Sequence, residues 1–147
     1  MATIRQIRDN FKLLNLDKSV MDTVMGHSQE ITDLNRKQLT YGTRSSGKRI
    51  GQYKNARYKA KKLAMNPLAS GNIDLILTGD YSNMINLRRD SDKVAELFSE
   101  DEKANMLKAE YGDDILGLSN SSIYELVNDT TFKPDLVKRI KISIKLQ

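Results

Sequence analysis

The sequence predicts an α+β fold, in which N-terminal helices accompany a small, mainly antiparallel sheet that further helices cover. Apolar residues recur at helical spacing near the N-terminus, short apolar runs of strand length occupy the middle of the chain, and amphipathic segments with capping signals follow them. A chain of 147 residues can build one real core but not two independent ones. We therefore expect a single α+β domain spanning residues 1–147.

The first 35 residues are predicted to be helical. Apolar residues from Ile4 to Leu14 share one face of a first helix. Asp17 or Ser19 can cap a second helix that extends to about Leu39. The sequence leaves open whether residues 1–35 project as a helical arm toward a neighbouring subunit or pack on their own subunit.

A basic region follows. Residues 41–51, YGTRSSGKRIG, combine three glycines and two serines with basic residues, which predicts an exposed, flexible basic loop. The spacing from Ile50 to Ala64 then indicates a helix whose exposed face carries Lys54, Lys59, Lys61 and Lys62. Asn66-Pro67 should end it.

The predicted sheet begins with Ile73–Tyr81, IDLILTGDY, which has the pattern of a buried strand running into a turn at Thr78, Gly79 and Asp80. Met84–Arg88 and Val94–Phe98 are short enough for strands, and the polar residues between them are typical of a hairpin. Two or three antiparallel strands follow from this pattern.

The helix after the hairpin carries two end signals. Ser99 and Glu102 form a Ser-x-x-Glu capping box at its start, and Gly112 can supply a left-handed residue at its end. Ile115–Leu118 should be a short buried run. Ser119–Val127, with Ile123, Leu126 and Val127 inward, and a segment starting near Pro134 should be helices. Lys141–Leu146 alternates polar and apolar residues, so this tail is either helix or edge strand.

The net charge of +5 conceals two oppositely charged regions. Residues 34–73 hold ten basic residues and no acid, whereas residues 90–114 hold nine acids and three lysines. A subunit that contacts copies of itself can use both regions, while a nucleic-acid binder needs only the basic one. Two ordinary solvated faces are the simpler alternative.

Composition argues against catalysis. The chain has no cysteine and one histidine, His27, so the usual nucleophile–base pairs and sulfur-ligated metal sites are nearly excluded. Asp113-Asp114 and the other acids lack an accompanying histidine and are more typical of turns and caps. We expect no enzymatic activity, cofactor, metal or small-molecule substrate.

One motif resembles a nucleotide site. Gly42–Lys48, GTRSSGK, matches the first seven positions of the phosphate-binding P-loop. Arg49 stands where that motif needs Ser or Thr for magnesium, and the preceding segment is too polar for the required buried strand. The sequence favours a plain basic loop.

No apolar run reaches the length of a membrane span, and the N-terminal residues lack a signal-peptide core. With no cysteine to bridge, the expectation is a soluble protein made in the cytoplasm, without membrane partners.

The order of segments resembles tail-completion and virion-morphogenesis proteins of tailed bacteriophages. A basic IGQYKNARYKAKK segment, DLILTGDY, a hairpin and SEDEKANMLKAEYGDDILGLS carry the resemblance, which covers roughly residues 50–140. It implies a virion structural protein synthesised in the host bacterium and located at the neck, where homo-oligomeric rings connect head and tail. Implied partners are copies of itself, the portal or adjacent neck and tail proteins, and packaged DNA through non-specific contact.

Three sets of residues are candidates on this interpretation. The basic set could face a neighbouring subunit or DNA, and consists of Arg44, Lys48, Arg49, Lys54, Arg57, Lys59, Lys61 and Lys62. The acidic set could meet it between subunits, and consists of Asp90, Asp92, Glu96, Glu100 and Asp101. Structural roles are predicted for Thr78, Gly79, Ser99, Glu102 and Gly112. The alternative function is a small nucleic-acid-binding protein that uses residues 36–62, with Tyr41, Tyr53 and Tyr58 available to stack on bases.

Overall fold

The α+β fold is confirmed by a computed structural model that describes residues 3–143, apart from the side chains at positions 7, 10, 11, 13 and 143. Within this range the α-helices are α1 (Ile4–Leu13), α2 (Leu16–Gly26), α3 (Ser28–Thr40), α4 (Ala56–Met65), α5 (Asp80–Asn83), α6 (Ala104–Tyr111), α7 (Asn120–Asp129) and α8 (Phe132–Ser143). The strands β1 (Ile85–Arg89) and β2 (Ala95–Ser99) form one antiparallel pair, and the 3-10 turns are η1 (Pro67–Ala69) and η2 (Asp113–Ile115).

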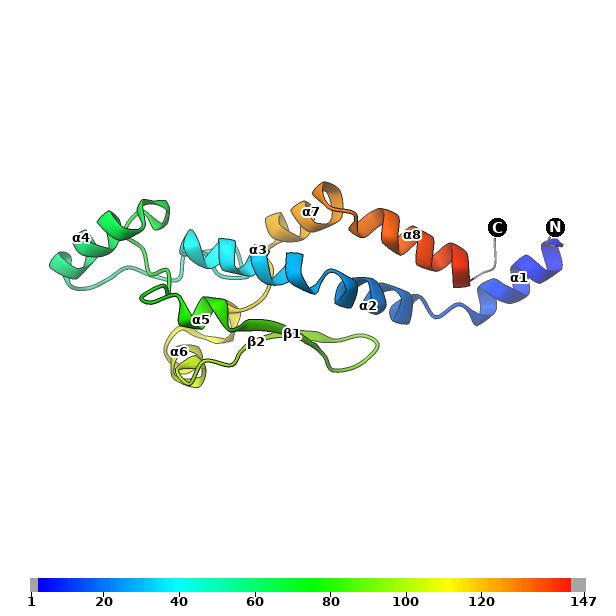
Figure 1. The fold of residues 1–147 in the computed structure, drawn as a ribbon, viewed down its shortest axis with the longest axis horizontal. Coiled ribbons are helices and arrows are strands. Elements are labelled where there is room, and N and C mark those ends of the chain that lie inside the picture. The colour runs from blue at the N-terminus through cyan, green and yellow to red at the C-terminus, as the bar shows by residue number, and fades with distance from the viewer. Residues whose placement is uncertain (1–2, 144–147) are drawn as a thin grey trace.

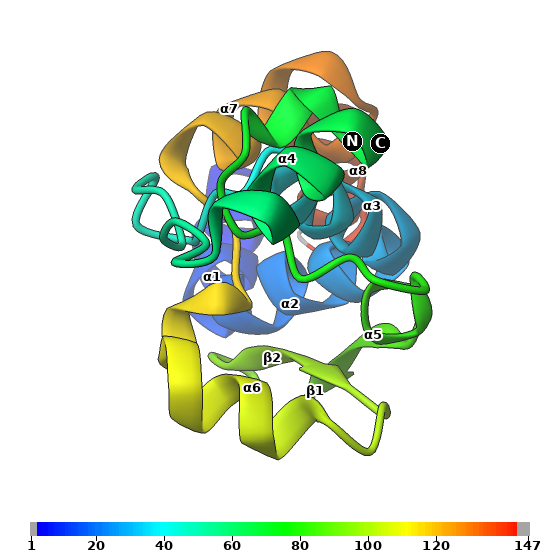
Figure 2. The ribbon, with the colours of Figure 1, turned by 90° about the vertical axis from the view of Figure 1, so that its left-hand side faces the viewer.

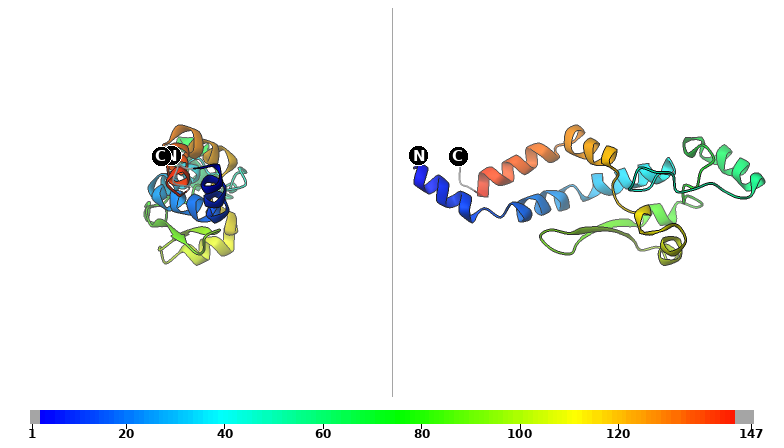
Figure 3. Two further views of the ribbon diagram at one scale, coloured as in Figure 1. Left: turned by 90° about the vertical axis from the view of Figure 1, so that its right-hand side faces the viewer. Right: turned by 180° about the vertical axis from the view of Figure 1, so that it is seen from behind.

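The molecule is long and narrow. Helices α2 and α3 follow one another along its long axis, with α1 at one end and α4 at the other (Figure 1). The view from behind shows the end of α8 beside the α1 end, and the hairpin and α6 along one side of the rod (Figure 3). An elongated shape leaves few positions for a central core.

The N-terminal helices differ from the prediction in one respect. Asn15 caps α2 by accepting a hydrogen bond from the Lys18 backbone N–H (2.9 Å), rather than Asp17 or Ser19. The second helix also ends at Gly26, and α3 starts afresh after His27. Residues 16–35 belong to the body of the molecule, because Met21, Ile31 and Leu34 are buried. Only α1 lies apart, so the projecting arm is shorter than residues 1–35.

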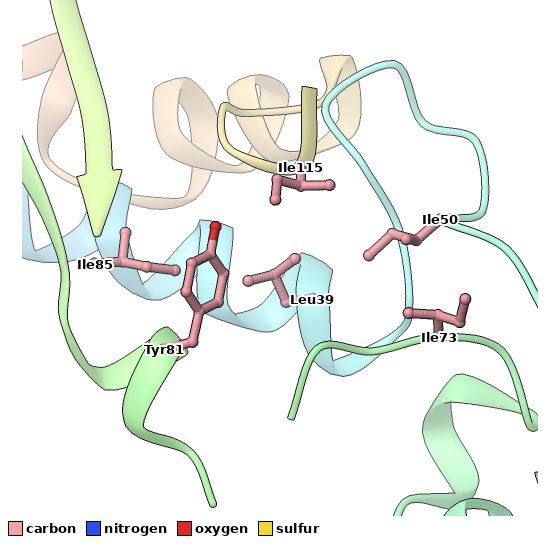
Figure 4. Packing of buried hydrophobic residues seen from close by; sticks show 6 residues of the cluster. All are labelled: Leu39, Ile50, Ile73, Tyr81, Ile85 and Ile115. Atoms are coloured by element: carbon pink, nitrogen blue, oxygen red, sulfur yellow. The ribbon is translucent and has the colours of Figure 1, made fainter. Parts of the chain in front are cut away.

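Two apolar clusters meet along α3. Leu39 belongs to the first cluster, which Figure 4 shows with Ile50, Ile73, Tyr81, Ile85 and Ile115 around it. Ile31 and Leu34, farther back on the same helix, belong to a second cluster with Leu126 and Phe132 from α7 and α8. Helix α3 therefore joins the C-terminal helices to the hairpin side of the molecule.

The hairpin confirms the predicted strands within one residue at each end. Ile85 pairs with Ser99 and Arg89 with Ala95. Arg36 of α3 fixes its entry, because its guanidinium donates to the backbone carbonyls of Ser82 (2.8 Å) and Ile85 (3.1 Å). Arg36, one of the ten basic residues of segment 34–73, therefore has a structural role within the fold.

The predicted strand at Ile73–Tyr81 is wrong. Ile73 and Asp74 are buried, yet the segment is irregular, with one isolated bridge between Asn72 and Gln52. Leu75 has a φ of +55°, which no continuous strand permits. The buried Asp74 carboxylate draws the chain into this bend, because its Oδ1 accepts a hydrogen bond from the Ile76 backbone N–H (3.1 Å). Gly79 has a φ of +89°, which explains the glycine at the predicted turn.

The predicted capping box is also wrong. Ser99 is the last residue of β2, and its hydroxyl donates to the Tyr81 carbonyl (3.0 Å) while accepting from the Asp101 N–H (3.3 Å). Helix α6 begins later, at Ala104, without a side-chain cap. Ladder pairing of Ser99 with Ile85 outcompetes the local helix signal. Gly112 has the predicted positive φ (+97°), but its ψ of 166° leads the chain away extended.

The C-terminal helices match their predictions more closely. The Ser119 hydroxyl caps α7 by accepting from the Ser122 N–H, and Leu126 is buried as expected. Ile123 is not inward, since 46% of it is exposed. Helix α8 is regular through Ser143, and positions 144–146 of the alternating tail lie outside the described residues.

Candidate subunit interface and basic surface

Helix α4 forms a basic end of the molecule. Asn55 caps it by accepting from the Tyr58 N–H (2.9 Å), and this start directs basic side chains outward. Lys54, Arg57 and Lys61 are exposed, and Lys59 is half-buried. None of the four has a carboxylate within 4.0 Å in the part of the chain that the structure describes. These four residues are called the basic tip below, and their charge is available to a partner.

Lys62 does not belong to that surface, so its prediction as an exposed basic residue is wrong. Its side chain is 3% exposed, and Nζ lies 2.8 Å from Asp74 Oδ1. The ammonium group also donates to the Ile76 carbonyl. Lys62 faces a different side of α4 from the exposed Lys61, because successive helical residues are rotated by about 100°. The inward lysine ties α4 to the segment after it.

The partner carboxylate is completely buried. Asp74 accepts from the Tyr53 hydroxyl (3.2 Å) and from Asn66 Nδ2 (2.9 Å) in addition to the ion pair. Burial opposes its ionisation, but the hydrogen bonds from Lys62, Asn66 and the Ile76 N–H outweigh burial and hold the pKa of Asp74 below its usual value. Burial beside Asp74 raises the pKa of the Tyr53 hydroxyl. Tyr53 is therefore engaged in the fold, and not free to stack on a base.

The basic loop at residues 41–51 is anchored at its base. Arg44 pairs with Asp114 (2.8 Å) and also donates to the Ile50 carbonyl (2.8 Å), so it is removed from the set of available cations. A bridge between Thr43 and Arg49 closes the loop, leaving Lys48 and Arg49 exposed. Helix α3, not a strand, precedes GTRSSGK, and no helix starts after Lys48 until α4. The loop lacks both flanking elements of a P-loop.

The acidic set is partly neutralised within the subunit. Glu96 pairs with Arg88 (2.6 Å) across the hairpin, and Asp92 pairs with Arg89. Asp101 Oδ1 accepts from the Lys103 N–H (2.7 Å) in the turn before α6. Asp90 and Glu100 are exposed and make no ion pair within the described residues. The end-on view places α6 and the hairpin on the opposite side of the molecule from α4 (Figure 2).

An apolar groove lies between α4, the irregular segment 73–81 and α6. Its volume is about 330 Å³, and its floor includes Leu75 and Tyr81. Leu77 (61% exposed) and Met106 (56% exposed) stand at its opening. The charged residues of the lining are Lys62, Asp80, Asp101 and Lys103. Because Lys62 is paired with Asp74, the two other acids and Lys103 leave one net negative charge on the lining.

His27 is packed rather than exposed. Its ring is buried between helices, with Nε2 2.9 Å from Asp135 Oδ2 and the ring centroid 5.3 Å from that of Phe132. Nδ1 lies 3.3 Å from Glu30 Oε1 without the geometry of a hydrogen bond. The hydrogen bonds from Thr131 and His27 lower the pKa of Asp135. This contact holds the α2–α3 junction against α8.

Sequence reasoning missed both the groove and the Lys62–Asp74 pair. The groove has no sequence signal, because segments far apart in the chain build it. The Lys62–Asp74 pair does have a sequence signal, because Asp74 is the first acid after Asp33 and directly follows the acid-free basic segment. An isolated acid inside an apolar run is rarely buried without a partner.

Comparison with protein-family models, curated proteins and solved structures found no match. Residues 3–143 contain no group of three or more acidic or histidine side chains arranged to hold a metal ion. Nor does any helix in that range combine the length and apolar character needed to cross a bilayer.

Proposed function

We propose that this chain is a non-catalytic structural subunit that assembles with copies of itself into a ring at the neck or tail of a bacteriophage virion. The family resemblance of residues 50–140 supplies the virion context. The physical support is the large and partly apolar surface that the isolated subunit exposes.

The isolated chain exposes too much surface, and too much of that surface is apolar. It exposes 9656 Å², whereas a compact monomer of 16.7 kDa is expected to expose roughly 7,600 Å². Large apolar residues at least 40% exposed occur on α1, α2, α4, α6, α7 and α8 and in the segments between helices; they include Leu16, Val20, Leu63, Met65, Leu68, Leu77, Met106, Ile123, Tyr124 and Val137. Surface of this kind supports burial against other subunits.

The charge distribution supports contacts between different faces of neighbouring subunits. The basic tip lies on or just before α4, whereas the exposed acids Asp90 and Glu100 directly follow β1 and β2. Figure 2 shows the hairpin on the opposite side of the molecule from α4. Contacts between unlike surfaces close into rings when the rotation between subunits permits closure. Complementary charge would set the order of the subunits more than the strength of the contact.

A small nucleic-acid-binding protein remains the second candidate, and the basic tip favours it. The four cations of the basic tip lie along α4 or just before it and have no carboxylate partner among the described residues; with the exposed Tyr58 beside them they could bind phosphates and stack on a base. The exposed apolar surface has no role in that function.

Mass measurement tests the proposal. Light scattering or native mass spectrometry on the full chain, alone and with its portal protein, should detect a multisubunit particle in at least one condition. The nucleic-acid alternative predicts a single subunit in both conditions, together with salt-sensitive binding to DNA of any sequence. That second result would overturn the ring.

A further inference from the structure

The apolar groove beside α6 and the projecting helix α1 lie at opposite ends of the molecule (Figure 1). We propose that the groove is the docking site for α1 of the next subunit. The inference rests on the proposed self-assembly and specifies which two surfaces meet. The resulting contact joins unlike faces, head to tail.

Helix α1 has the sequence of a docking helix. In the sequence, Ile4, Ile7 and Phe11 of α1 recur at the spacing with which an amphipathic helix inserts anchors into an apolar groove, and Leu14 follows directly after the helix. Ile4 is 88% exposed, so its own subunit provides no cover for it. A short helix of this kind is marginal in water unless its apolar face is packed.

The groove offers complementary chemistry. Its volume of about 330 Å³ can accept apolar anchors, and Leu77 and Met106 present an exposed apolar opening. Helix α1 carries Arg5, Arg8 and Lys12 against a single acid, Asp9. Asp80 and Asp101 line the groove with one lysine, Lys103, besides the paired Lys62, so the lining carries one net negative charge. A basic amphipathic helix therefore meets an apolar groove of weakly opposite charge.

The absence of cysteine makes the contact directly measurable. Two singly substituted full-length chains, Ile4→Cys and Leu77→Cys, are mixed and oxidised gently. We expect a disulfide-linked heterodimer between them. The matched control replaces Leu77→Cys with Asn128→Cys, because Asn128 on α7 is exposed and belongs neither to the groove nor to the exposed apolar residues. Equal cross-linking at both positions, or no cross-link at Leu77, would overturn the proposal.

A second measurement uses mass. Ile4→Glu removes the arm contact and Leu77→Glu removes the groove contact, and neither substitution disturbs a buried side chain. Each variant alone should associate at least about tenfold more weakly than wild type, since each contact would bury a charge. Mixed together, they should form a one-to-one complex and nothing larger, because one functional arm and one functional groove remain. Asn128→Glu, at an exposed position of α7 outside the groove, should retain wild-type assembly.

The two proposals fail in different ways. Multisubunit particles that persist in Ile4→Glu and Leu77→Glu would sink the arm–groove contact and leave the ring intact. Wild-type chains that stay single subunits, alone and with the portal protein, would sink both.

Discussion

Lys62 Nζ lies 2.8 Å from Asp74 Oδ1, and both side chains are almost completely removed from solvent. This ion pair is the polar link between α4, which carries the basic tip, and the segment that lines the groove. The integrity of both candidate surfaces therefore depends on one buried contact.

Removing the lysine should be costly for folding. Lys62→Met leaves the Asp74 carboxylate buried without its cation, and we expect a loss of about 3–5 kcal/mol in the free energy of unfolding. The neighbouring Lys61→Met is the matched control, since Lys61 is exposed and should change stability by less than about 0.5 kcal/mol. Denaturant melts measure both. Equal free energies of unfolding for the two variants would mean that the Lys62–Asp74 ion pair is not formed.

The Asp74 carboxylate should make the stability of the fold depend on pH. Because the pKa of Asp74 is lowered in the folded state, the unfolded chain binds the proton more readily, and stability rises with pH through this window. The stability that Asp74 contributes is fully present above its pKa in the unfolded chain, about 3.9, and is lost as the pH falls through its lower pKa in the folded state. Unfolding free energies measured from pH 6 downward should fall more steeply for wild type than for Asp74→Asn. Parallel curves would contradict this assignment.

Two glycines provide a matched test of backbone strain. Gly112 has a φ of +97°, and a Cβ there would lie 3.3 Å from Asp114 Oδ1. Gly112→Ala should lower the free energy of unfolding by about 1–3 kcal/mol. Gly26 ends α2 without a positive φ, and its new Cβ would meet only the Arg139 side chain at 3.5 Å, so Gly26→Ala should be neutral or stabilising by up to about 1 kcal/mol. Thermal or denaturant melts giving the reverse order would refute the assigned backbone.

Charge reversal at the basic tip separates assembly from DNA binding. Lys54→Glu with Lys61→Glu removes two exposed cations without touching the Lys62–Asp74 pair. If the tip binds DNA, the slope of log affinity against log salt should shrink by about 0.9 for each lost phosphate contact. DNA titrations across a salt series measure that slope.

The acidic partner gives the complementary measurement. Asp90→Lys with Glu100→Lys reverses the two exposed acids that make no ion pair within the described residues, and assembly through opposite charges predicts weaker incorporation into particles. Combining both double reversals should restore incorporation in part, since exposed pairs contribute only about 0–1 kcal/mol each. Incorporation unaffected by either reversal would remove charge pairing from the ring model.

The sequence by itself determined the elements whose signals are local. The α+β class, the hairpin at residues 85–99, the end of α4 at Asn66-Pro67 and the Ser119–Val127 helix were all predictable, because periodicity, breakers and caps act within a few residues. The positive φ of Gly112 was predictable for the same reason.

Only the tertiary structure decided the rest. Ser99 carries a capping signal but pairs with Ile85 in the sheet, and the apolar run at Ile73 bends because Asp74 must reach Lys62. Arg36, Arg44 and Lys62 look like free cations in the sequence, yet each is held by groups distant in the chain: the carbonyls around Ser82, the Asp114 carboxylate and Asp74. Local propensity contributes a few tenths of a kcal/mol to about 1 kcal/mol per residue, whereas a buried charge without a partner lowers stability by several kcal/mol. Long-range pairing therefore overrides local preference wherever the two conflict.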